Sequence, residues 1–248
     1  MKILYDNLVN SATIDSTTEN PDYLFSVALV DSRLSRVGRT IDVSDQGVKF
    51  SFTTAVDVTY IAITAHNLTS SATVKLQANT SDSWTTPAFE TTLTDYGTWC
   101  VDSFTKQTYQ YWRLFIDDDT NTNGYLEIGY VFLGEDLTMP GMNRAMIIPQ
   151  KTNSVSSKSI SGQLYGDKRL NYKAAEIKFD VIEDSERQSI KAFFDYVDVI
   201  TPFVLLIWED DLDVEPPIYC NLTEELSWNK LDLIGLLWSL SLKFEECF

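Results

Sequence analysis

One segment of this 248-residue chain has a clear helical period, and it limits the fold classes open to the rest. Four apolar residues recur at helical spacing and define one face: Ile190, Phe193, Phe194 and Val197. Ser185 and Gln188 have the spacing of a capping box, and Pro202 disfavours helix immediately before it. The pattern predicts a single amphipathic helix over about 185–198.

The segments that flank this helix have the patterns of β-strands. Residues 176–181 alternate between charged and apolar side chains, the period of a strand with one buried face. Pro202–Trp208 is an apolar run too short to span a membrane. Two later segments, Ile218–Leu222 and Leu237–Glu245, also alternate. The second half of the chain is therefore expected to be a β-barrel or sandwich that carries one helix.

The first half consists of short alternating segments separated by clusters of Thr, Ser, Asn and Asp, a texture typical of an all-β sandwich. The expected strands are Lys2–Leu8, Val48–Thr53, Val58–Thr64, Ala72–Ala78, Trp99–Phe104, Tyr111–Asp117 and Tyr125–Leu133. Met139-Pro140-Gly141 interrupts this texture. We therefore expect a mainly β protein with two domains, residues 1–139 and 140–248.

Charge is distributed unevenly along the chain. The net charge of −17 predicts repulsion from nucleic acid and from anionic membranes. Residues 150–173, called the arm below, contain five basic residues and one acidic residue, a net charge of +4 that leaves −21 elsewhere. The arm has the pattern of an extended hairpin or a long loop. Its charge would suit docking onto an acidic surface of a neighbouring copy, with a solvated loop as the alternative.

Several phrases of the first domain resemble those of galactose-binding-like (discoidin) domains, in the same order. They are Ser16–Tyr23, Val27–Asp31, Ser35–Thr40, Ala62–Thr69, Tyr111–Ile116 and Leu126–Gly134. The resemblance implies an eight-stranded jelly roll. It also implies either sugar binding or packing against partner proteins, since fold alone does not define function.

Phrases of the second domain resemble those of minor tail and distal-tail proteins of tailed bacteriophages. They are Phe193–Asp195, Thr201–Val204, Pro217–Tyr219, Leu226–Trp228 and Leu240–Glu246. The resemblance implies a tail-tube-like fold that assembles into a six-fold ring, with tail-tube and tail-tip hub proteins as neighbours. The inter-subunit contacts would come from the basic residues of the arm: Lys151, Lys158, Lys168, Arg169 and Lys173.

Two features of the first domain are candidate ligand contacts. Trp84 and Tyr96 lie in loop-like sequence, where exposed rings would suit a host-surface glycan, with core or edge packing as the alternative. Asp119, Asn121 and Asn123 match the first half of a calcium loop. The position that should hold a glutamate is Tyr130, so a hairpin turn at Asn123-Gly124 is the better interpretation and no metal site is expected.

Motifs for catalysis are missing from the sequence. There is no phosphate loop, nucleophile elbow or zinc-protease pair, and the single histidine, His66, precedes a turn. Cys100, Cys220 and Cys247 lack metal-site spacing and are expected to be buried reduced thiols. We expect neither enzyme activity nor a cofactor, and synthesis in a bacterial cytoplasm, because no signal peptide or membrane span is evident.

These observations favour a structural virion protein of a phage tail tip, a distal-tail type ring component that joins the tail tube to tip proteins. An alternative of a different class is a carbohydrate-binding adhesion protein that recognises the host surface through its first domain. A weaker third hypothesis is an accessory subunit of a glycoside hydrolase. The sequence leaves the host, the glycan, the tail position and the copy number open.

Overall fold

The computed structural model describes residues 1–140, 148–231 and 237–247, and it is mainly β, as expected. Two compact units are present. The sandwich unit contains residues 6–136 and 208–217, and the helix unit contains residues 1–5, 137–207 and 218–247. The expected boundary lay between residues 139 and 140. The first five residues nevertheless belong with the C-terminal part of the chain, and residues 208–217 belong with the sandwich.

The sandwich unit is built on two long antiparallel strands, β4 (Gln46–His66) and β8 (Trp99–Asp117). Around them the sheet has the order β3-β9-β4-β8-β5-β6, with β2 on β4 and β7 on β8. The shorter strands are β2 (Thr13–Ser16), β3 (Gly38–Arg39), β5 (Thr73–Asn79), β6 (Phe89–Thr92), β7 (Thr94–Asp95) and β9 (Glu127–Gly134).

Each long strand serves both layers of the sandwich. Residues 46–51 of β4 pair with the end of β8, which also pairs with β5, whereas residues 60–66 pair with β9. The register shifts between Ser51 and Val56, and again between Val58 and Tyr60. The expectation of separate strands at 48–53 and 58–64, and at 99–104 and 111–117, was therefore wrong. Bulges bend a continuous strand at these points, where sequence alone suggests a turn.

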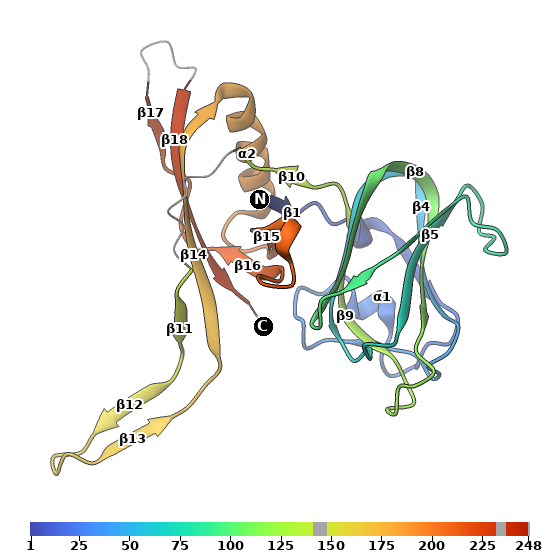
Figure 1. Cartoon of the computed structure of the whole chain (residues 1–248), viewed down its shortest axis with the longest axis horizontal. Helices are drawn as coiled ribbons and strands as arrows, with labels where there is room; N and C mark the ends of the chain where they lie inside the picture. The colour runs from blue at the N-terminus through green and yellow to red at the C-terminus, as the bar shows by residue number, and fades with distance from the viewer. Residues whose placement is uncertain (141–147, 232–236, 248) are drawn as a thin grey trace. The chain divides into compact units, whose positions relative to one another are not determined.

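Between the two layers lies a dry apolar core. Its largest members include Trp112, Phe50, Phe25, Ile61 and Leu114, all at most 1% exposed. Two short helical turns contribute to it, η1 (Leu8–Ser11) through Val9 and α1 (Phe25–Ala28) through Phe25. A further turn is η2 (Glu209–Asp211). Figure 1 shows α1 beside β9.

The helix unit contains a second sheet, with the strand order β10-β1-β15-β16-β18-β14-β11. In addition, β17 pairs with β18. Its strands are β1 (Lys2–Leu4), β10 (Leu137–Thr138), β11 (Gln150–Thr152), β14 (Asn171–Glu183), β15 (Phe203–Leu206), β16 (Ile218–Leu222), β17 (Trp228–Lys230) and β18 (Leu237–Glu246). All the pairs are antiparallel. The first strand of the chain thus lies between strands more than 130 residues away in sequence.

Helix α2 (Asp184–Val197) packs on this sheet through the face predicted from the sequence. Ile190, Phe193 and Val197 are buried, and the Phe193 ring lies 5.0 Å from that of Phe203. The predicted cap was displaced by two residues. Glu183 is the N-cap, and its amide donates to the Glu186 carboxylate at 2.8 Å. Carboxylates at this end also complement the partial positive charge of the helix N-terminus.

The arm is a two-stranded ribbon formed by β12 (Val155–Lys158) and β13 (Leu164–Asp167). Figure 1 shows it reaching away from its own sheet beyond β11 and β14. Every residue of both strands is exposed. An isolated hairpin is marginal in water, because it buries almost nothing to offset its ordering.

Candidate functional site

A pocket of about 440 Å³ opens in the sandwich unit, beside α1. Ten residues from two neighbouring stretches of the chain line it: Pro21, Asp22, Tyr23, Leu24, Val27, Ala28, Ser35, Arg36, Val37 and Arg39. The stretches are held together by backbone hydrogen bonds, in which the Arg39 amide donates to the Tyr23 carbonyl at 2.9 Å and the Asn20 amide donates to the Arg39 carbonyl at 2.8 Å. The walls of the pocket are therefore fixed by the fold.

Close packing between α1 and β3 sets the shape of the pocket. Phe25 is 1% exposed and lies so near Gly38 that a Cβ on Gly38 would fall 2.3 Å from a ring carbon. The Phe25 amide donates to the Glu19 carboxylate, which ties the start of α1 to the isolated β-bridge between Glu19 and Thr40. Phe25 and Leu29 belong to the core, whereas Leu24, Val27 and Ala28 line the pocket.

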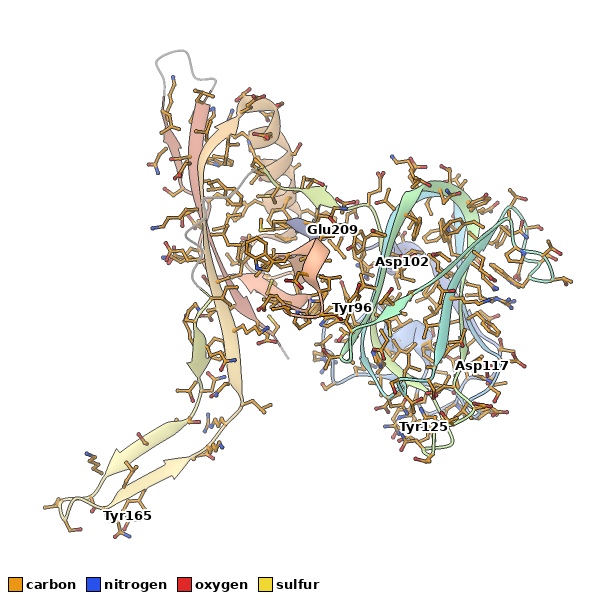
Figure 2. The ribbon with its side chains drawn as sticks, viewed as in Figure 1. Tyr96, Asp102, Asp117, Tyr125, Tyr165 and Glu209 are labelled. Carbon is orange, nitrogen blue, oxygen red and sulfur yellow. The ribbon has the colours of Figure 1, made fainter. Side chains whose placement is uncertain are left out.

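Arg39 is the most firmly held polar side chain of the pocket wall. Its Nε donates to Oε2 of Glu127 at 2.9 Å. The guanidinium carbon lies 4.0 Å from the centroid of the Tyr23 ring and 4.8 Å from that of the Tyr125 ring. The cation–π contacts and the ion pair with Glu127 together restrict the orientation of the guanidinium. The hydrogen bond to Glu127 uses only the Nε–H donor, so the bond leaves the other N–H donors of the group for a ligand. Figure 2 places Tyr125 at one end of the sandwich.

A second arginine of the pocket belongs to an exposed ion cluster. Asp31 accepts hydrogen bonds from Arg33 at 2.7 Å and from Arg36 at 2.9 Å. The side-chain hydrogen bond from Arg33, with the further bonds from Arg33 and Arg36, holds the pKa of Asp31 well below its usual range. The same contact raises the pKa of Arg33. Asp31 thereby orients Arg36 at the rim.

The two arginines that line the pocket are each paired with a carboxylate. Arg36 pairs with Asp31 and Arg39 with Glu127, neither of which lines the pocket, and Asp22 is the acidic residue of the lining. This pairing is local, because the chain as a whole carries −17. Such a site offers hydrogen bonds in both directions without a strong field, which favours a neutral polar ligand.

The sequence predicted sugar contacts at Trp84 and Tyr96, and neither residue lines this pocket. The Trp84 ring is half-buried, donates from Nε1 to Asp82 at 2.6 Å, and has the Arg113 guanidinium 4.8 Å from its centroid. Tyr96 is half-buried in the turn between β7 and β8, and its amide donates to the Trp99 carbonyl at 2.7 Å. A role for either ring in binding stays a prediction.

Sequence reasoning missed Tyr23, Arg36 and Arg39 as site residues, although all three lie in phrases that carry the discoidin resemblance. A signal was available at Tyr23, because Pro21-Asp22 suits a turn that would present the next side chain. Only tertiary contacts, however, bring Tyr125 and Glu127 to the same place.

The calcium-like loop is a turn between β8 and β9, and Gly124 has a φ of +75°. Asn121 is buried and donates to Asp118 at 3.0 Å, and Thr69 donates to the same carboxylate through its amide at 2.9 Å. Asp118 is thus satisfied by groups of the protein. Asp119 and Asn123 flank this turn, and the residues described include no group of three or more His, Cys, Asp or Glu side chains that could hold a metal ion.

The cysteines are unpaired in the structure. Cys100 Sγ lies 3.7 Å from His66 Nε2, but burial raises the pKa of Cys100 to about 12 and lowers the pKa of His66. Burial also raises the pKa of Cys220 well above its usual value. A neutral thiol beside a neutral imidazole is a poor nucleophile.

The basic residues of the arm do not form one cluster. Lys151 pairs with Glu245 at 2.6 Å and Arg169 with Asp167 at 2.8 Å, both at exposed positions. Lys173 lies at the base of the arm, opposite Gln150 in the β11–β14 pair. In the part of the chain that the structure describes, Lys158 and Lys168 form no ion pair.

Comparison with known proteins places about half of the chain beside carbohydrate-binding modules. The chitosan-binding module 1 of a chitosanase/glucanase from Paenibacillus sp. IK-5 is 17% identical and has a TM-score of 0.41, over 53% of this chain and all of that chain. The family 32 module of NanJ from C. perfringens, solved with galactose, is 16% identical with a TM-score of 0.41, over 54% of this chain and 98% of its own.

A third similar structure is CpGH89CBM32-5 from Clostridium perfringens, in complex with GalNAc-β-1,3-galactose. It is 12% identical, with a TM-score of 0.40, over 54% of this chain and 99% of that one. No protein-family model and no curated protein matches the chain. These comparisons lend no support to the resemblance to phage tail proteins. Within the described ranges, no helix has the length and apolar character needed to cross a membrane.

Proposed function

We propose that the sandwich unit binds a neutral saccharide in the pocket beside α1. The observation that carries the proposal is the Arg39 guanidinium, fixed between two tyrosine rings and a carboxylate at the wall of a 440 Å³ pocket. Preorganised polar groups in a concave site are the usual basis of ligand recognition. The pocket is large enough for about one or two sugar rings at that scale.

A sugar ring requires a flat apolar surface for its C–H face and fixed donors and acceptors for its hydroxyl groups. Tyr23 is 40% exposed and supplies a ring at the edge of the pocket. Arg36 and Arg39 supply donors, and Asp22 and Ser35 supply acceptors. Because Arg36 and Arg39 are already paired with Asp31 and Glu127, a ligand without net charge does not have to neutralise them.

A glycan array followed by calorimetry on the full chain would test this proposal. Galactose and chitosan oligomers belong in the panel alongside glucose and mannose families. We expect Tyr23→Ala to weaken binding about fivefold to tenfold, the range for loss of an aromatic contact. The matched control is Trp84→Ala, which removes an aromatic ring from the same unit outside the pocket. Unchanged binding in Tyr23→Ala with loss in Trp84→Ala would move the site to Trp84.

The exposed arm favours a second candidate function, that of a structural protein in a phage tail tip. In this hypothesis copies assemble into a ring, expected to be a hexamer, between tail tube and hub proteins, and the protein is made in the host bacterial cytoplasm before it joins the virion. The support is a basic ribbon with five exposed large apolar side chains: Val155, Ile160, Leu164, Tyr165 and Leu170. Such a ribbon suits a partner surface.

The solution mass from light scattering, with negative-stain images of the same peak, tests the assembly function. Rings that disappear when Lys158 and Lys168 are both changed to Glu would support it. The control changes Lys178 and Lys191 to Glu, the same change of charge at exposed positions outside the arm. A monomer at every concentration, with and without tail-tube protein, would count against it. Glycan binding and assembly are compatible, since they use different units.

A further inference from the structure

The turn between β8 and β9 contains Asn123-Gly124, the single Asn-Gly pair of the chain. Both residues are exposed, and Gly124 has a φ of +75°. A Cβ built on Gly124 would meet nothing within 4 Å, so the space around its amide is open. The pair therefore places an accessible carboxamide next to a backbone amide that has no side chain of its own.

The two neighbouring amides of this pair are weakly held. In the part of the chain that the structure describes, the Asn123 carboxamide makes no hydrogen bond, and the Asn123 backbone amide donates to Asn121 Oδ1 at 3.1 Å. The Gly124 amide donates to the Asn121 carbonyl at 3.4 Å, beyond the usual range of about 2.7–3.2 Å for such bonds. The Asn121 carboxamide, by contrast, donates to Asp118 at 3.0 Å. The Asn123 side chain is thus free to turn toward the Gly124 nitrogen.

We propose that Asn123 is a site of spontaneous deamidation, at which the chain modifies itself through a cyclic succinimide. The Gly124 nitrogen gives up its proton to a base in the solvent and attacks Cγ of Asn123. An N–Cγ bond forms, the Cγ–Nδ2 bond breaks, and Nδ2 leaves as ammonia with a proton from the solvent. Water then opens the five-membered ring. Attack at Cγ gives aspartate, and attack at the main-chain carbonyl carbon of Asn123 gives isoaspartate.

The residue after an asparagine decides how readily the ring closes. A side chain on that residue crowds the attacking nitrogen, whereas glycine leaves it open and allows the backbone more conformations. Asn20 precedes Pro21, whose nitrogen has no proton to lose. Asn153 is exposed in the arm but precedes Ser154, whose amide donates to Thr152 Oγ1 at 3.0 Å. Exposure is therefore shared with the arm, and the following glycine distinguishes the turn.

The products differ from the parent chain in charge and in backbone length. Either product adds one negative charge to a chain that already carries −17. Isoaspartate also adds one carbon to the backbone before Gly124. The chain after the turn is fixed, because the Tyr125 carbonyl accepts from Asn67 Nδ2 at 2.9 Å. The Leu126 amide also donates to Thr40 Oγ1 at 2.9 Å. The extra length has to be absorbed at the turn or at these bonds, so we expect the isoaspartate form to unfold more easily than the aspartate form.

Incubation of the full chain at pH 7 and at pH 9, followed by peptide mapping with mass spectrometry, tests the proposal. We expect Asn123 to be converted before any other asparagine, and faster at pH 9, because the attacking nitrogen must lose its proton. The native protein should gain an isoform with one more negative charge in isoelectric focusing. An isoaspartyl carboxyl methyltransferase, which transfers a methyl group to the isoaspartate carboxylate, should label the incubated protein.

Asn123→Gln is the diagnostic variant, because the longer side chain would have to close a six-membered ring, which forms more slowly. This variant should lose the new acidic isoform. Asn153→Gln is the matched control, since Asn153 is an exposed asparagine without a following glycine, and the variant should keep the isoform. A synthetic peptide of residues 119–128 gives the time scale of the reaction in an unfolded chain.

Three results would overturn the proposal. An acidic isoform that persists in Asn123→Gln would place the modification elsewhere, and so would conversion of Asn153 ahead of Asn123. A native chain that stays unmodified while the peptide is largely converted would mean that the fold protects the turn. None of these results bears on saccharide binding, which calorimetry tests separately.

Discussion

Arg39 and Glu127 form an ion pair at 2.9 Å between two paired strands of the sandwich unit, β3 and β9. The two side chains are about a quarter exposed, and the residues lie 88 positions apart in sequence. The pair joins the pocket wall to a strand of the central sheet. Its position makes it both a structural contact and a support for the proposed ligand site.

Replacing Glu127 by Gln should lower the free energy of unfolding by about 1 kcal/mol, since a charge-assisted hydrogen bond becomes a neutral one. Saccharide affinity should fall as well, because the guanidinium loses the carboxylate that orients it. Urea unfolding and calorimetry would measure the two effects. Glu90→Gln, which alters an ion pair of similar length with Lys75, should cost less than about 0.5 kcal/mol and leave affinity unchanged.

Gly38→Ala should destabilise the sandwich unit by about 1–3 kcal/mol, the range for overpacking a filled core. The new methyl group would lie 2.3 Å from the Phe25 ring and 2.9 Å from its backbone, so α1 would have to move. Because α1 forms a wall of the pocket, binding should weaken too. Gly166→Ala is the control, since its Cβ would meet nothing closer than 3.6 Å. Equal unfolding midpoints for both variants would contradict this account.

His66 should titrate below its usual pKa, because burial lowers its pKa and Asp95 opposes that shift only in part. Its Nδ1 accepts a hydrogen bond from the Leu68 amide at 3.3 Å, which protonation would break. As pH falls through about 6.5, the unfolded chain takes up the proton first, so stability should fall with pH. His66 is the sole histidine, and its NMR resonances would report the pKa directly. A pKa at or above 6.5 would exclude this environment.

The buried thiols should react slowly with a disulfide reagent at pH 8 and quickly after unfolding. Burial raises the pKa of Cys100 to about 12 and the pKa of Cys220 well above its ordinary value. Above about pH 9 the unfolded chain loses these protons and the folded chain keeps them, so stability should fall as pH rises. The Cys100→Ala variant should show a smaller fall between pH 9 and 11. Rapid labelling of three thiols in the native protein would contradict the prediction.

Local periodicity explains which parts of the fold the sequence could predict. The buried face of α2 follows from the spacing of Ile190, Phe193 and Val197, and the alternation of β14 and β18 follows from residues a few positions apart. The mainly β class follows in the same way. The cap at Glu183 was missed because Ser185 offers an equally good local pattern, and the choice between them depends on where β14 ends.

The sequence by itself determined the strand and helix character of the chain, its charge, and the basic character of the arm. Tertiary structure decided which strands continue through bulges, that β1 pairs with β15, and that Tyr23, Arg39, Tyr125 and Glu127 meet at one pocket. The reason is physical. Secondary structure depends on neighbours within a few residues, whereas strand partners and binding sites depend on contacts between distant segments, which no local pattern encodes.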